Sequence, residues 1–124
     1  IKEKIKEAGM ESRVILLGKQ ENPYPFIMGC DMYVQPSRFE GNAVTVREAQ
    51  ILCKPVIVAN YPTAHSQIKQ GIDGIIVPQD NAGCVHEMAG FIKNKELQQN
   101  IVSYLKEHDY GNEKEVQKLY NLMN

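Results

Sequence analysis

Short apolar runs alternate with segments of helical periodicity along most of this chain. The runs predict strands at Glu11–Gly18, Asp31–Ser37, Lys54–Asn60 and Gly74–Pro78. Each run is continuously apolar, which is typical of strands covered by helices on both faces. Strand–helix–strand repetition at this spacing forms right-handed crossovers. The sequence therefore predicts an α/β fold: a Rossmann-like parallel sheet of four visible strands, flanked by helices.

Helical patterns fill the intervals between these strands and dominate the C-terminal part. Helices are expected at Phe26–Gly29, Val44–Leu52, Ala64–Lys69, Asn81–Ile92, Lys95–Lys106 and Asn112–Met123. The last one opens with a pattern that resembles a capping box, Asn112 with Glu115 three residues later. Ile1 leads directly into an amphipathic helix that has no start signal. We therefore expect residues 1–124 to be a single domain cut from a longer protein.

The composition argues against several classes of function. Fourteen basic and fifteen acidic residues give a net charge of −1, which disfavours a nucleic-acid partner. The longest apolar runs are too short for a transmembrane segment or a signal peptide. Three scattered cysteines and three scattered histidines match neither a disulfide framework nor a metal-ligand spacing. We expect a reduced, cytoplasmic protein without a metal.

Ligands of open parallel sheets bind beyond the carboxyl ends of the strands, over the N-termini of helices. This rule selects four segments, Gly18–Tyr24, Pro36–Thr45, Asn60–Ser66 and Pro78–Asn81. In the second segment, backbone N–H groups at the start of the helix could cradle a diphosphate, and the Thr45 hydroxyl could assist. Glu48 could accept the two hydroxyls of a ribose, and Glu40 those of a sugar. Alternatively, Glu40 is a helix-start carboxylate and Glu48 a solvated helical residue.

The wider sequence resembles one family. Glu40 and Glu48 stand eight positions apart, as in the E-x7-E motif of the retaining glycosyltransferases of family 4. Further blocks agree in order: R-V-I-L-L-G at Arg13–Gly18, S-R-F-E-G at Ser37–Gly41, E-A at Glu48–Ala49, K-P-V-I-V at Lys54–Val58 and D-G-I-I-V-P at Asp73–Pro78. The chain thus resembles the C-terminal, donor-binding domain of a GT-B glycosyltransferase.

The resemblance implies roles for individual residues. Glu40 would be the catalytic-site carboxylate that contacts the donor sugar near its 3- and 4-hydroxyls, and Glu48 would bind the ribose. The sugar and diphosphate would meet the segment formed by Gly41, Asn42, Ala43, Val44 and Thr45. Gly18 and Lys19 would flank the base through their backbone. Neither Arg13 nor Lys19 matches the Arg/Lys pair that clamps the diphosphate in this family.

The resemblance also implies an activity. The full-length enzyme would transfer a sugar with retention from a nucleotide sugar, most simply a UDP-sugar, without a metal or other cofactor. Its partners would be a glycan or lipid-linked acceptor and an N-terminal acceptor-binding domain that this chain lacks. Such an enzyme is expected in the cytoplasm, with peripheral attachment to the inner membrane face through the missing domain. The chain alone should be inactive.

Departures from the family pattern surround the expected donor pocket. They are Asn42 and Ala43 after E-G, Gln50 for a common Met, Cys53 for Gly, Tyr61–Ala64 for a Gly-Gly turn and Gln67 for a frequent Glu. These changes bear on the identity of the donor more than on the fold. Two other readings stay open: a UDP-sugar 2-epimerase-like domain, and a non-catalytic α/β binding module.

Overall fold

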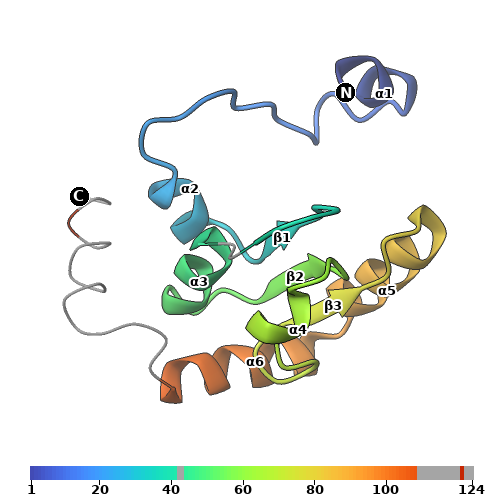
Figure 1. Cartoon of the computed structure of the whole chain (residues 1–124). Coiled ribbons are helices and arrows are strands. Elements are labelled where there is room, and N and C mark those ends of the chain that lie inside the picture. Colours follow the sequence, from blue (N-terminus) through green and yellow to red (C-terminus); the bar gives the residue numbers. More distant parts are fainter. Residues whose placement is uncertain (42–43, 109–120, 122–124) are drawn as a thin grey trace.

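The computed structural model describes residues 1–41, 44–108 and 121. In chain order the elements are α1 (Lys2–Glu7), α2 (Tyr24–Gly29), β1 (Tyr33–Gln35), α3 (Val44–Ile51), β2 (Val56–Ala59), α4 (Ala64–Gln67), β3 (Ile75–Val77), α5 (Asn81–Lys93) and α6 (Lys95–Glu107). The strands form a parallel sheet in the order β1-β2-β3. This confirms the predicted α/β fold (Figure 1). The helix predicted at Asn112–Met123 lies outside the described residues, apart from Asn121.

The sheet separates two apolar layers, because alternate side chains of a strand point to opposite faces. Val56 and Val58 of β2 pack with α2 and α3 on one face. Ile57, between them, packs with α5 and α6 on the other face. All four residues of β2 are buried. The continuously apolar run of β2 is thus explained by helices on both sides.

Polar caps define where the two long C-terminal helices begin. The Asp80 carboxylate accepts a hydrogen bond from the Gly83 N–H (2.7 Å) at the start of α5. The Asn94 side chain accepts one from the Leu97 N–H (3.1 Å) and so separates α6 from α5. Each cap satisfies a backbone donor that the helix cannot satisfy itself. The boundaries of both helices match the sequence pattern within a residue or two.

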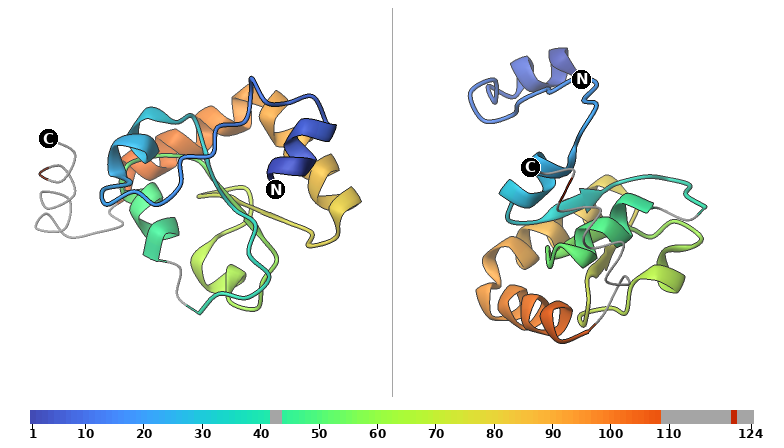
Figure 2. Two further views of the ribbon diagram at one scale, coloured as in Figure 1. Left: turned by 90° about the horizontal axis from the view of Figure 1, so that it is seen from above. Right: turned by 90° about the vertical axis from the view of Figure 1, so that its left-hand side faces the viewer.

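The strand predicted at Glu11–Gly18 is wrong. Residues 11–13 form a turn and residues 14–20 have no regular secondary structure. The run Val14–Leu17 is exposed, with Ile15 at 78%. In Figure 1 and the right-hand view of Figure 2 this segment and α1 stand apart from the sheet. An apolar run becomes a strand only beside a hydrogen-bonding partner, and none of the described strands pairs with this one.

One departure from the pattern of the family that the sequence resembles lies at the end of α3. Cys53 has a left-handed backbone, with φ at 60°. The N–H groups of Cys53 and Lys54 bond the carbonyls of Gln50 (3.0 Å) and Ala49 (2.9 Å), which is a Schellman motif. Glycine adopts this conformation at the lowest cost. A thiol-bearing residue therefore occupies a position whose geometry favours the glycine that is usual in the family.

The side-chain amide of Gln50 in α3 is buried at a cost in folding free energy. Its side chain is 1% exposed, and both amide atoms lack a hydrogen-bond partner in the described part of the chain. Replacing Gln50 by Met, which has similar volume and no amide, is expected to raise the free energy of unfolding by about 1 kcal/mol. Urea unfolding measures this change. The control is Gln98→Met, which removes hydrogen bonds to the carbonyls of Phe91 and Ile92 and should lower stability. A Gln50→Met variant less stable than the parent would contradict the prediction.

Candidate functional site

Three loops meet at the carboxyl ends of the strands, as parallel topology requires. The Thr63 hydroxyl, in the loop after β2, donates to the backbone carbonyl of Glu40 (2.6 Å). The Gln79 amide, after β3, donates to the carbonyl of Arg38 (2.9 Å). These bonds join segments 23 and 41 residues apart in sequence. The loop after β1 is therefore bonded to the loop after β2 and to the loop after β3. Three of the four predicted segments lie together at this edge of the sheet.

Glu40 is half-buried and anchored by side chains of its own loop and strand. Its Oε1 accepts hydrogen bonds from Gln35 Nε2 (2.8 Å) and Ser37 Oγ (2.6 Å). Neither bond comes from the backbone of α3. Among the described residues, the Glu40 carboxylate thus makes no contact with the start of α3, which was the alternative role left open by the sequence. The two hydrogen bonds fix the direction of the carboxylate.

Glu48 is the fifth residue of α3 and is half-buried. Its Oε1 accepts a hydrogen bond from the Tyr24 hydroxyl (3.0 Å), which comes from the first turn of α2. Burial raises the pKa of Tyr24, and the bond to Glu48 and its charge raise the pKa further. Tyr24 is therefore protonated at neutral pH and acts as the donor. Glu48 is not simply a solvated helical residue, because a tyrosine from another helix holds it.

Tyr33 of β1 connects the two carboxylates electrostatically. Burial raises its pKa most, a hydrogen bond from Thr45 lowers it, and the charges of Glu40 and Glu48 raise it. The pKa of Tyr61 is raised by burial first and then by Glu40 and Tyr33. Both carboxylates thus act on the phenol of Tyr33, the first residue of β1. The sequence pattern did not single out Tyr24, Tyr33 or Gln35, because their contacts depend on the packing of separate elements.

The remaining predicted site residues are placed less completely. Asn42 and Ala43 lie outside the described residues. Gly41 and Val44 are exposed on either side of them. The Thr45 side chain forms a hydrogen bond with that of Tyr33. Gly18 and Lys19 lie in the exposed loop between α1 and α2, where Gly18 has a φ of 69°.

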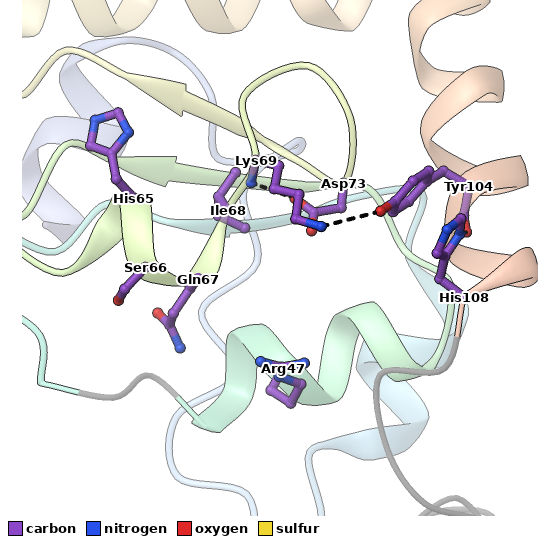
Figure 3. Close-up of a pocket in the computed structure, with 9 residues that line it drawn as sticks. All are labelled: Arg47, His65, Ser66, Gln67, Ile68, Lys69, Asp73, Tyr104 and His108. Carbon is purple, nitrogen blue, oxygen red and sulfur yellow. Dashed lines mark hydrogen bonds between the residues drawn. The ribbon is translucent and has the colours of Figure 1, made fainter.

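A separate hollow of about 320 Å³ lies beside α4 and the end of α6 (Figure 3). It is lined by Arg47, His65, Ser66, Gln67, Ile68, Lys69, Asp73, Tyr104 and His108. Lys69 Nζ donates to the Tyr104 hydroxyl (3.4 Å), and its backbone N–H donates to Asp73 (2.7 Å). Neither Glu40 nor Glu48 lines this hollow. We assign the site to the paired carboxylates, because the loops converge there.

Two further properties concern the described residues alone. No group of three or more metal-ligating side chains lies together in the described part of the chain. No described helix is long and apolar enough to cross a membrane.

Comparison with protein families gives a match over residues 1–108 to the model described as "Glycosyl transferases group 1". Among curated proteins, the chain is 26% identical over 83 residues to the lipopolysaccharide core biosynthesis mannosyltransferase LpsB of Rhizobium meliloti. It is 32% identical over 79 residues to the N-acetylgalactosamine-N,N'-diacetylbacillosaminyl-diphospho-undecaprenol 4-alpha-N-acetylgalactosaminyltransferase of Campylobacter jejuni. These matches cover 65% and 62% of this chain, but only 24% and 21% of the relatives.

Solved structures share the fold. Anabaena HepE in complex with UDP superposes with a TM-score of 0.75 at 19% identity, over 98% of this chain and 33% of that one. TarM superposes with a TM-score of 0.74 at 23% identity, over 99% of this chain and 26% of that one. A glycosyltransferase from Rickettsia africae gives a TM-score of 0.68 at 21% identity, over 98% and 32%. The expected architecture, one part of a GT-B glycosyltransferase fold, agrees with these neighbours.

Proposed function

The chain belongs to the glycosyl transferases group 1 family, and we propose that it forms the donor-binding part of a longer, retaining glycosyltransferase of family 4. The observation that carries this proposal is the pair of held carboxylates, Glu40 in the loop after β1 and Glu48 on α3. A ribose and a sugar ring both present hydroxyls, and ionised carboxylates accept hydrogen bonds from them. Glu48 then binds the ribose, and Glu40 binds the transferred sugar.

The diphosphate of the donor lies between these two groups in the proposed complex. It meets the start of α3, where Gly41, Asn42, Ala43, Val44 and Thr45 can present backbone N–H groups to it. The positive end of the helix dipole favours an anion there. Gly18 and Lys19 flank the base. No metal or other cofactor takes part in the proposed reaction.

We propose a UDP-sugar as donor, which is consistent with the UDP bound to the structurally similar HepE. The curated relatives are a lipopolysaccharide core mannosyltransferase and a diphospho-undecaprenol-linked N-acetylgalactosaminyltransferase, so the proposed acceptor is a glycan or a lipid-linked sugar. The acceptor-binding part and the basic diphosphate clamp belong to the rest of the full-length protein. The proposed place of action is the cytoplasm, at the inner face of the membrane.

The test is to incubate the full-length protein with a panel of UDP- and GDP-sugars and to analyse all products. We expect release of UDP and transfer of the sugar with retention from one donor, and no transfer by the 124-residue chain alone. Half a cleft cannot hold donor and acceptor together, so the main advantage of proximity is lost. An isomerised UDP-sugar without UDP release would favour the epimerase reading. Binding without turnover of any donor would favour the non-catalytic module.

A further inference from the structure

Four polar side chains form a chain of hydrogen bonds that ends on Glu40. Thr45 donates to the Tyr33 hydroxyl, and Tyr33 donates to Gln35 Oε1 (2.5 Å). The Gln35 amide then donates to Glu40 Oε1 (2.8 Å). These bonds begin in the first turn of α3, run along one face of β1 and reach the loop beyond it.

The direction of this chain is set by chemistry. Tyr33 has one hydroxyl proton, and because it donates that proton to Gln35, its hydroxyl acts as the acceptor toward Thr45. A tyrosine hydroxyl can donate only to the oxygen of the amide. The two N–H groups of Gln35 must therefore point the other way, and they reach Ser37 Oγ (2.8 Å) and Glu40 Oε1.

The geometry also concentrates the donors on one oxygen. Ser37 Oγ accepts from Gln35 and donates to the same Glu40 Oε1 (2.6 Å), so the three side chains close a small ring. Hydrogen bonds donated to an ionised acceptor are shorter and stronger than bonds between neutral groups. Aligned donors also polarise one another. The ring holds Oε1 and leaves Oε2 without a donor among the residues that the structure describes.

We propose that Gln35 is a positioning residue for Glu40, and that Tyr33 positions Gln35 in turn. The inference rests on the proposed function of Glu40. Gln35 fixes the carboxylate through Oε1 and thereby aims Oε2 at the donor sugar. A positioned carboxylate stabilises developing positive charge without reorganisation during the reaction. Losing its support lowers turnover more than it weakens substrate binding.

The experiment uses the full-length protein with the UDP- or GDP-sugar that it turns over fastest. Gln35→Met keeps the length of the side chain and removes both amide donors. We expect kcat to fall about tenfold, the effect of losing one charged hydrogen bond, while KM changes less than about twofold. Tyr33→Phe keeps the Gln35 side chain but removes the hydrogen bond that orients its amide, and should lower kcat about threefold.

The control is Gln70→Met. Gln70 also uses both amide atoms, bonding the backbone N–H (2.6 Å) and carbonyl (3.3 Å) of Ile76. This substitution removes two hydrogen bonds of a glutamine near a strand, and Gln35→Met removes three. It is expected to lower the melting temperature and to leave kcat unchanged. A loss of kcat in this control equal to that of Gln35→Met would make the effect structural and overturn the proposal.

Combining each substitution with Glu40→Ala decides whether Gln35 acts through Glu40. We expect Gln35→Met and Tyr33→Phe to cause no further loss of kcat in that background. An equal loss in both backgrounds, or no loss from either single variant, overturns the positioning role and leaves the proposed function intact. If Glu40→Ala itself turns over normally, or the parent turns over no donor, the proposed function fails and this inference fails with it. Should Gln35→Met not fold, Tyr33→Phe applies the same test.

Discussion

Replacing Glu40 by alanine in the full-length protein is expected to lower kcat about 100-fold or more, as the loss of an electrostatic stabiliser does in other enzymes. Positive charge builds on the anomeric carbon as the donor bond breaks, and a fixed carboxylate near the sugar stabilises that charge. Because the contact strengthens in the transition state, kcat should fall more than KM rises. Steady-state kinetics with the preferred nucleotide sugar measure both constants.

The control for Glu40→Ala is Glu96→Ala. Glu96 is an acidic residue in the first turn of α6, where it interacts with the helix dipole. Its removal should cost some stability and no turnover. Calorimetry should show UDP affinity unchanged by Glu40→Ala, since Glu40 serves the sugar and not the nucleotide. A Glu40→Ala protein that melts earlier and turns over at the parental rate would assign Glu40 a structural role only.

Local patterns were sufficient to predict most of the fold. Residues 54–60 contain the continuously apolar run Val56–Ala59, and β2 is indeed buried on both faces. Asp80 and Asn94 are of residue types that favour the N-cap position, and both cap a helix in the structure. In each case the information lies within a few residues. Where the residues of one segment determine its secondary structure, that structure can be predicted from the segment alone.

Pairing between distant segments could not be predicted in the same way. The run Val14–Leu17 has the composition of a buried strand, yet it is exposed and pairs with none of the described strands. Whether such a run joins a sheet depends on a neighbouring edge, which its own residues do not specify. The same limit explains an unpredicted contact of the candidate site. Tyr24 reaches Glu48 across 24 residues because α2 packs near α3.

The candidate site was predicted as a pair of glutamates, and the structure adds what holds them. The spacing of Glu40 and Glu48 is visible in the sequence, but an isolated pair at this spacing has no defined orientation. Two hydrogen bonds fix Glu40 and one fixes Glu48. These donors are uncharged, so they orient the carboxylates without neutralising them.

Glu48→Gln tests the nucleotide half of the site. Gln keeps an oxygen that can accept the Tyr24 hydroxyl, so the contact between α2 and α3 is preserved while the charge is lost. The charged acceptor for the ribose hydroxyls disappears, and UDP binding to the full-length protein is expected to weaken by about 1–3 kcal/mol. That corresponds to a rise in Kd of roughly 5- to 150-fold, which titration calorimetry resolves.

The matched control is Glu87→Gln, which makes the same change at an exposed position of α5. It alters the net charge equally and should leave UDP affinity unchanged. Tyr24→Phe adds a second comparison, because it removes the hydroxyl that holds Glu48 and keeps the charge. It should weaken UDP binding less than Glu48→Gln does, since the carboxylate can still reach the ribose after paying the entropy of ordering one side chain. Equal UDP affinity in the Glu48→Gln and parental proteins would exclude Glu48 as the ribose ligand, whatever the fate of Glu40.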